Sequence, residues 1–504
     1  MRKIPATMAT QHPDNASAPF WDKQKDPFIS VYKEIDEAVI CLDELGASEF
    51  MWDWEGKHAD AAVIDKLFSE YFDYFSKNQL HRDKFLTFRI PNIWEEKGYS
   101  LLLAMTVILS SEDFARDLKF DKRPLFEIIL PMTENANQLM KMHTLFEKLA
   151  DFKSKEFTTE DADNQNQIEL IPLVESVKSQ QSVGKLLREY VGKYKKRYGN
   201  NPEYIRPFFA RSDPALMSGM LATVLANKIA ISQVYGFAEK TGIPVFPLSG
   251  AGSLPFRGGL SPDAVDDYMR EYPGLRTVTV QSSFRYDNPL SQVKAAITRL
   301  EEKLPKIPPV IYSPDVEKKL IAIGKISEKY YQKTLAGIAP DMKDVFASVP
   351  KRRERRQHIG LLAYGRKVGE QKMPRAITFT AGFYSIGVPP ELIGTGRALK
   401  KLSEEDRQTV FEHYKLLKSD MEKAGRYLNL DNLERLAAAN PAWQDIKKDI
   451  KSVSEILGIE LGTSTPAEKK HHNLTSEILD KKDNPGKALT NKITETAELR
   501  KSLG

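Results

Sequence analysis

Cysteine is almost absent from this sequence of 504 residues, and Cys41 is the only one. A single thiol excludes an intrachain disulfide framework and any zinc or iron–sulfur site built from several cysteines, which is typical of a reducing compartment. Long apolar runs are also missing, because the stretch from Leu101 to Leu109 is much shorter than the roughly 20 residues of a membrane helix. The first residues, MRKIPATMATQHPDN, lack the apolar core of a signal peptide. We therefore expect a cytoplasmic protein with no membrane partner.

A strong excess of one charge is missing as well, since 74 Lys and Arg residues are balanced by 69 Asp and Glu residues. Such an even balance does not imply a polyanionic partner. The densest basic run, Lys351–Arg356, could grip nucleic acid. It lacks the interleaved aromatic residues of a reading module, however, and is more typical of a solvated helix face. We expect no nucleic-acid partner.

The sequence does contain a regular alternation of apolar and amphipathic segments. Seven runs rich in β-branched and aromatic residues begin 34 to 43 residues apart, with helix-like stretches between them. Nearly continuous hydrophobicity within a run is typical of parallel strands that are covered on both faces. The seven runs are Glu49–Trp54, Phe85–Pro91, Leu125–Met132, Ile168–Glu175, Tyr204–Arg211, Ile243–Gly250 and Thr277–Ser283.

This alternation favours an α/β fold, a (β/α)8 TIM-type barrel with additional α-helices mainly toward the C-terminus. The eighth strand is less evident. Arg375–Gly382 is one candidate, although the same residues could form a helix and loop at the barrel mouth. We expect a single domain over residues 1–504, with barrel strands at about 49–283 and helical additions at about 290–504.

Charged residues gather where the apolar runs end, which is where the working residues of such a barrel lie. Glu175 ends the fourth run and Asp213 follows the fifth, so two carboxylates could lie side by side at the mouth. One or two carboxylates, completed by waters and a substrate phosphate, suit Mg²⁺ or Mn²⁺. The alternative is structural, with each carboxylate capping the following helix or pairing with a nearby arginine.

A glycine-rich segment at the end of the sixth run predicts an anion site. Between Ser249 and Gly259, small residues let the backbone approach a ligand, and Arg257 adds a planar fork of donors for phosphate or carboxylate. Arg366 and Arg375 bring further cations to the site. Taken singly, the loop could be a plain tight turn and each cation a surface charge.

Histidine is scarce, with 8 in the chain. His12 lies in the stiff segment Thr10–Asn15, where it could be structural or could move protons near neutral pH. The pair His471 and His472 belongs to a tail, from Pro466 on, that is most simply solvated surface.

With these pieces assembled, the chain resembles the phosphoenolpyruvate carboxylase family, in its short archaeal-type form, over nearly its whole length. Five motifs fall in the family's order, and they are Thr10–Asn15, Ile171–Glu175, Arg211–Asp213, Thr241–Gly259 and the two later arginines. The resemblance implies His12, Arg257, Arg366 and Arg375 as catalytic residues, and Glu175 and Asp213 as ligands of Mg²⁺ or Mn²⁺. We assign Arg89, Arg211, Gly258, Gly259 and Arg285 to substrate binding.

The resemblance also implies the reaction, which is carboxylation of phosphoenolpyruvate by bicarbonate to oxaloacetate and inorganic phosphate, in a homotetramer. The sequence departs from the long bacterial and plant forms, which have a His and an Arg where Ser249 and Ala251 stand, and a Lys at Leu216. Part of the anion grip must therefore come from other residues, for example Arg89, Arg211, Arg285 or Lys57.

Two other functions stay open at this point. A different barrel enzyme acting on phosphoenolpyruvate or pyruvate, such as a lyase or phosphotransferase, would share the metal carboxylates and arginines but would not need bicarbonate. A non-catalytic nucleic-acid-binding or scaffold protein would use Lys351–Arg356 and the helical tail.

Overall fold

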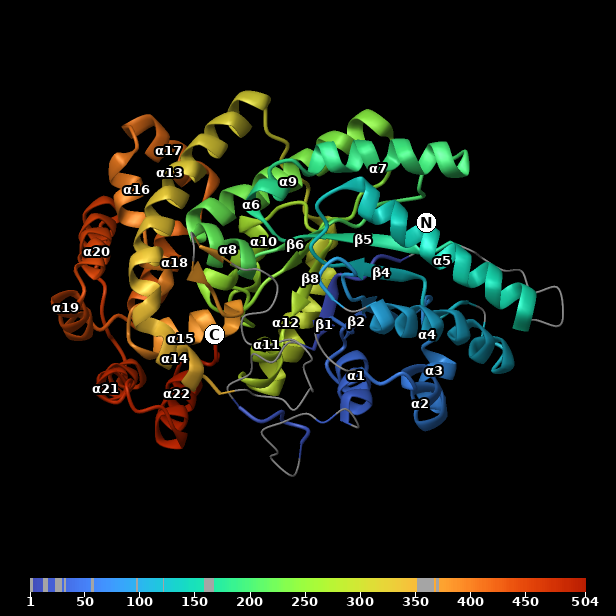
Figure 1. The fold of residues 1–504 in the computed structure, drawn as a ribbon, viewed down its shortest axis with the longest axis horizontal. Coiled ribbons are helices and arrows are strands. Elements are labelled where there is room, and N and C mark those ends of the chain that lie inside the picture. The colour runs from blue at the N-terminus through green and yellow to red at the C-terminus, as the bar shows by residue number, and fades with distance from the viewer. Residues whose placement is uncertain are drawn as a thin grey trace.

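The computed structural model describes residues 3–11, 17–22, 30, 33–55, 59–96, 98–120, 122–157, 167–350, 367–368 and 371–504. At its centre, parallel strands form a closed barrel in sequence order, and the last strand pairs back onto the first (Figure 1). The strands are β1 (Thr7–Thr10), β2 (Glu49–Asp53), β3 (Phe85–Arg89), β4 (Glu127–Leu130), β5 (Glu169–Val174), β6 (Phe208–Ala210), β7 (Leu248–Gly250) and β8 (Thr277–Val280).

The predicted (β/α)8 barrel is confirmed, and the seven apolar runs supply β2 to β8. The eighth strand lies near the N-terminus instead of at Arg375–Gly382. Residues of β1 pair with β2 on one side and with β8 on the other, so the barrel strands begin at residue 7 and not at about residue 49. The segment Arg375–Gly382 is not a strand, because its residues from Ala376 on belong to helix α15 (Ala376–Ser385).

Helices follow the strands and cover the outside of the barrel (Figure 1). The buried strands can be this apolar because both of their faces are covered. These helices are α1 (Glu34–Leu42), α2 (Val63–Glu70), α3 (Phe72–Lys77), α4 (Gly98–Asp117), α5 (Ala136–Phe157), α6 (Val177–Gln180), α7 (Val183–Tyr198), α8 (Ser212–Ser218), α9 (Met220–Thr241), α10 (Val265–Glu271), α11 (Ser282–Tyr286) and α12 (Leu290–Lys303).

The predicted helical additions are present as a second layer on one side of the barrel (Figure 1). They are α13 (Pro314–Ile338), α14 (Lys343–Ser348), α15, α16 (Thr395–Lys401), α17 (Glu404–His413), α18 (Leu417–Gly425), α19 (Leu430–Ala439), α20 (Gln444–Leu457), α21 (Pro466–Asp480) and α22 (Lys487–Leu499), with a small ladder of β9 (Lys367–Val368) and β10 (Gln371–Lys372). His471 of α21 is fully buried, and its Nε2 lies 3.3 Å from Arg500 Nη1, so the prediction that it is solvated is wrong. Within the described ranges, no helix is long and apolar enough to cross a membrane. The basic run Lys351–Arg356 lies outside the described residues.

Alternation along the strands sorts the interior side chains into layers. At the amino ends of the strands, the fully buried Arg206 donates to Glu49 Oε2 at 2.8 Å and to Glu127 Oε2 at 2.6 Å. The next layer is apolar and consists of Met8, Met51, Ile129, Ile171, Leu173, Phe208 and Leu248. The following positions toward the carboxyl ends are polar and include Arg89, Glu175 and Gln281. The functional side chains therefore lie at the barrel mouth.

Candidate active site

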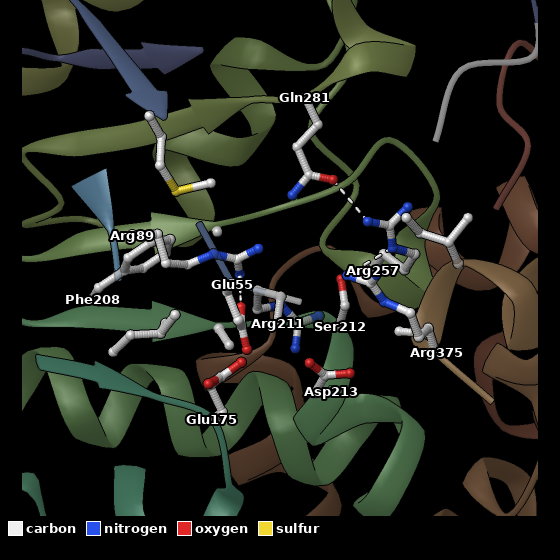
Figure 2. Close-up of a pocket in the computed structure, with 16 residues that line it drawn as sticks. Glu55, Arg89, Glu175, Phe208, Arg211, Ser212, Asp213, Arg257, Gln281 and Arg375 are labelled. Atoms are coloured by element: carbon white, nitrogen blue, oxygen red, sulfur yellow. Dashed lines mark hydrogen bonds and ion pairs between the residues drawn. The ribbon is translucent and has the colours of Figure 1, made fainter. Parts of the chain in front are cut away.

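A cavity of about 80 Å³ lies at the barrel mouth, between the carboxyl ends of the strands and the start of α15. Its charged lining consists of Arg89, Arg211, Arg257, Arg375, Glu55, Glu175 and Asp213 (Figure 2). An adjoining cavity of about 460 Å³ has Glu175 and Asp213 in its wall as well. The two carboxylates therefore stand where the two cavities meet.

Arg89, at the end of β3, is held by two neighbouring acids. Its Nε and Nη2 donate to the two carboxylate oxygens of Asp53 at 2.9 and 2.7 Å, and its Nη1 lies 2.8 Å from Glu55 Oε2. Burial by itself lowers the pKa of Arg89, but Asp53 and Glu55 raise it well above its ordinary value. Burial raises the pKa of the Glu55 carboxyl, and the positive charge of Arg89 opposes that rise. Arg89 therefore lines the cavity as a charged guanidinium group whose position is fixed by its ion pairs with Asp53 and Glu55.

Glu175 and Asp213 come from consecutive strands, as the sequence predicts. Glu175 follows β5, and Asp213 lies in the first turn of α8, which begins directly after β6. Figure 2 shows both carboxylates turned toward the same space. One oxygen of Glu175, Oε2, accepts a hydrogen bond at 2.6 Å from the backbone N–H of Met132. Met132 has a φ of 50°, a left-handed conformation that is unfavourable for a residue with a side chain, so strained backbone orients this carboxylate.

The donor set at this point fits a hard divalent cation. Two half-buried carboxylates at the mouth of a cavity offer oxygen ligands and leave space for water and a substrate oxygen, which is the preference of Mg²⁺ and Mn²⁺. The described residues contain no group of three or more His, Cys, Asp and Glu side chains that could hold a metal ion. A site made of protein ligands alone, as zinc prefers, is therefore not present in that part of the chain.

Arg257 lies at the end of a short 3-10 helix, η2 (Pro255–Arg257), in the glycine-rich loop. Its Nε donates to Ser212 Oγ at 3.0 Å, its Nη2 donates to Gln281 Oε1 at 2.7 Å, and its Nη1 donates to the backbone oxygen of Gly504. A Cβ atom at Gly252 would lie 2.9 Å from the Arg257 Cζ, which explains the glycine there. The backbone of the loop at Gly252 therefore packs directly against the guanidinium group of Arg257.

Arg211, at the end of β6, lines the cavity and has unsatisfied donors in the part of the chain that the structure describes. Its side chain is almost fully buried, with 1% exposed, and it lines the cavity. Its Nε and Nη1 have no hydrogen-bond partner among the described residues. A buried cation with unmet donors costs free energy unless an anion binds there. Figure 2 places its guanidinium group beside the space that Glu175 and Asp213 face.

The remaining predicted site residues fall in different places. Arg285 does not line either of these cavities. It is fully buried in α11, where it hydrogen-bonds the Thr10 carbonyl and Cys41 Sγ and lies 3.4 Å from Glu37 Oε1. Gly258 and Gly259 shape the turn after Arg257, with φ values of 129° and 76°. His12, Lys57 and Arg366 lie outside the described residues.

The structure adds residues that the site prediction did not include. Ser212 and Gln281 anchor Arg257, and Glu55 pairs with Arg89. Each of them follows a barrel strand, so the position of a polar residue at a strand end was a signal in the sequence. Gly504 carries no such signal, since it is 247 residues from Arg257 in the sequence.

Comparison of the sequence with known proteins identifies the family of this chain. A profile of the family described as phosphoenolpyruvate carboxylase matches residues 4–504. The chain belongs to the phosphoenolpyruvate carboxylase family. A phosphoenolpyruvate carboxylase from Leuconostoc mesenteroides is 50% identical, covering 100% of this chain and 99% of the relative. One from Oenococcus oeni is 49% identical with the same coverage, and one from Pyrococcus horikoshii is 38% identical over 89% of this chain and 94% of the relative.

Family membership confirms two predictions from the sequence, the resemblance itself and the class of enzyme, a phosphoenolpyruvate carboxylase. The match runs through both the barrel and the outer helical layer. The outer layer is therefore part of the carboxylase fold and not an unrelated appendage.

Proposed function

We propose that the mouth cavity binds phosphoenolpyruvate and bicarbonate beside a divalent metal ion and converts them to oxaloacetate and inorganic phosphate. The observation that carries the proposal is the buried Arg211, whose Nε and Nη1 lack partners among the described residues, beside two half-buried carboxylates. Unmet donors next to oxygen ligands suit an anion that bridges a guanidinium group and a cation.

The charges of the lining support a highly anionic substrate. Four guanidinium groups and three carboxylates give the lining a formal charge of +1. Glu175 and Asp213 would hold Mg²⁺ or Mn²⁺, which raises this charge to +3 and suits a phosphate and a carboxylate on one small molecule. When bound, the ion supplies Lewis-acid stabilisation of the negative charge that develops on the substrate oxygen.

The protein groups then have separate tasks. Arg211, Arg257 and Arg375 bind the phosphate and carboxylate oxygens, where planar guanidinium forks hold two oxygens at once. Bicarbonate attacks the phosphorus atom, which gives carboxyphosphate and the enolate of pyruvate. The resemblance assigns His12 the acceptance of the carboxyphosphate proton, so that carbon dioxide and phosphate are released and the enolate carbon bonds to the carbon dioxide. The site must exclude water at this stage, because water would protonate the enolate to pyruvate.

A coupled assay tests this proposal. Oxaloacetate is followed from phosphoenolpyruvate, with the metal ion and bicarbonate withheld in turn, and both omissions are expected to abolish product. Oxaloacetate formation that continues without metal would refute the metal proposal. Phosphate release that does not depend on bicarbonate would instead favour the lyase or phosphotransferase alternative.

The His12 assignment has its own test. His12→Asn is expected to leave metal and substrate binding in place while bicarbonate-dependent phosphate release exceeds oxaloacetate formation. Equal rates of phosphate and oxaloacetate release in the variant would remove His12 from this step.

Arg211 has a matched control on the surface. Arg211→Leu removes the unpaired donors and is expected to raise the KM for phosphoenolpyruvate by about 10- to 100-fold, since hydrogen bonds to charged groups contribute about 1.5–3 kcal/mol each. Arg435→Leu removes an exposed arginine that pairs with Asp480 and should leave KM unchanged. An unchanged KM in Arg211→Leu would show that the cavity is not the substrate site.

The resemblance also supports a homotetramer in the cytoplasm that supplies C4 dicarboxylic acid to metabolism. Light scattering on the purified chain tests the assembly, and a mass of one subunit would refute it.

A further inference from the structure

We propose that the outward face of helix α4 is the surface on which a second copy of this chain docks. This α4 face consists of the exposed side chains of Tyr99, Leu102, Leu103, Thr106 and Phe114, which follow one another along one side of the helix. The inference rests on the assembly of several copies in the proposed function, since it names a surface through which copies pair.

The first three turns of α4 are apolar on every side. On the inward side, Leu101 and Met105 are buried in the hydrophobic core. On the outward side, Tyr99 is 53%, Leu102 is 52% and Leu103 is 41% exposed. A helix that is apolar all round is typical of a helix that is buried, whereas a surface helix is polar on its solvent side. Figure 1 shows α4 on the side of the barrel away from the outer helical layer, so that layer does not cover this face.

The lack of charge on the α4 face determines what can cover it. No charged residue occurs in the sequence from Gly98 to Ser111. A partner must be apolar as well, because a charge buried without a counterion is costly. The α4 face of a second copy meets this requirement, since a two-fold interface places one surface against itself. The middle of the face is Thr106, so antiparallel pairing about this residue brings Tyr99 of each copy close to Phe114 of the other.

The exposed apolar area is that of a stable interface. At the end of α5, Lys153 Nζ donates to the Leu109 carbonyl at 2.8 Å and lies 2.7 Å from Asp113 Oδ2, so Phe152 lies beside α4. Phe152 is 57% and Phe157 is 73% exposed, and their ring centroids are 5.6 Å apart. At about 150–250 Å² for each aromatic side chain, these two and the two aromatic residues of the α4 face present roughly 330–550 Å². A standard interface buries about 800 Å² per partner, of which roughly 450–520 Å² is apolar.

The charges beside the α4 face do not favour a membrane as the occupant. Helices that lie on membranes carry Lys and Arg on their polar side, where anionic lipids attract them. Helix α4 instead continues into Glu112, Asp113 and Asp117, and its one cation, Arg116, lies 3.7 Å from Asp113. An anionic surface would repel this end of the helix.

Leu102→Glu tests the surface in the full chain, by light scattering over a range of protein concentrations. The variant would bury two carboxylates without counterions at each interface, so we expect the dissociation constant to rise by about 100-fold or more. The measured mass should fall to half where the unmodified chain is fully assembled. Leu430→Glu is the matched control, because Leu430 is 49% exposed at the start of α19, and it should leave the mass unchanged. If circular dichroism shows that Leu102→Glu does not fold, Tyr99→Lys makes the same test.

Thr106→Cys tests the antiparallel pairing. Cys41, the only cysteine of the natural chain, is fully buried, so mild oxidation of the variant should link two chains through residue 106 alone. Adding Leu102→Glu to the variant should abolish the link, because the two copies no longer pair.

Three results would overturn the α4 face as the docking surface. They are an unchanged mass for folded Leu102→Glu, an assembled Thr106→Cys protein that forms no link, and sedimentation of the unmodified chain, but not of Leu102→Glu, with vesicles of phosphatidylcholine and phosphatidylserine. The last result would identify a lipid surface as the occupant. A mass of one subunit for the unmodified chain would refute the proposed assembly together with this surface. A chain that assembles through the α4 face but forms no oxaloacetate would refute only the proposed carboxylation.

Discussion

The raised pKa of Glu391, a buried carboxyl that contacts the glycine-rich loop, predicts how the stability of the protein changes with pH. Glu391 lies in the 3-10 helix η5 (Pro390–Leu392) and is fully buried. Its Oε1 accepts hydrogen bonds from the Phe256 backbone N–H at 2.8 Å and from the Tyr384 hydroxyl at 2.7 Å. Its Oε2 has no hydrogen-bond partner in the part of the chain that the structure describes. Burial raises the pKa of this carboxyl to about 7.

The sign of the effect follows from the two states of the chain. Between the ordinary pKa of 4.5 and about 7, the folded protein keeps a proton on Glu391 that the unfolded chain has released. The free energy of unfolding therefore falls as pH rises through this window, and above pH 7 the full cost of burying the charge is present. One pKa unit corresponds to about 1.4 kcal/mol, so the rise gives a cost of about 3 kcal/mol at pH 8.

Glu391→Gln removes the charge and keeps an oxygen that can accept both hydrogen bonds. Relative to the natural protein, the variant should gain about 2–3 kcal/mol in free energy of unfolding between pH 5 and pH 8. Urea unfolding followed by tryptophan fluorescence, with both proteins at both pH values, measures this difference. If the free energies of unfolding of the two proteins change by the same amount between pH 5 and pH 8, the pKa of Glu391 is not raised.

Glu468→Gln is the matched control. The Glu468 carboxylate accepts hydrogen bonds from Ser464 and Thr465 at the start of α21, and although burial opposes it, these bonds hold the pKa below its ordinary value. Stability from this group is present above pH 4.5 and is lost only below it, so the control variant should be destabilised almost equally at pH 5 and pH 8.

Three further predictions concern charged residues of the site and of the core. Glu175→Gln and Asp213→Asn should each weaken Mn²⁺ binding by about 10-fold or more, measured by electron paramagnetic resonance, and normal affinity in the double variant would refute the metal proposal. Arg285→Lys should lower the midpoint of thermal unfolding and leave the KM for phosphoenolpyruvate unchanged. The reason is that the Arg285 side chain contacts Glu37 and the Thr10 carbonyl and does not line the cavity. A raised KM would show that Arg285 contributes to substrate binding. Arg206→Met leaves two buried carboxylates without their cation and should lower the free energy of unfolding by about 3–5 kcal/mol in urea unfolding; an unchanged free energy would show that the pairs do not stabilise the barrel.

The sequence predicts most of the barrel because β2 to β8 lie in short apolar runs that recur at regular intervals. It does not reveal β1, since Thr7–Thr10 is short and half of it is threonine, so its hydrophobicity gives little signal. The segment after Arg375 has a β-branched and aromatic composition that favours a strand locally, but it is a buried helix in which tertiary packing outweighs propensity. The local sequence was therefore sufficient to predict a strand only where the strand lies in an apolar run.

The site was predictable to the same extent. Glu175, Asp213, Arg89, Arg211 and Arg257 could be placed at the mouth because each one lies at a strand end or in the loop after it. Arg285 also follows a strand closely, but a turn of helix directs its side chain into the core. The direction of a side chain after a strand depends on the local backbone, which composition and spacing do not specify.

The pairing of β1 with both β2 and β8 has a consequence for synthesis on the ribosome. Thr10 and Val280 are separated by 270 residues, so the first strand to emerge waits for its second neighbour until most of the barrel has been translated. At about 5–20 residues per second, this wait is roughly 15 to 55 seconds. During that time one edge of the nascent sheet has unpaired backbone groups, and a chaperone that shields this edge would favour closure over aggregation.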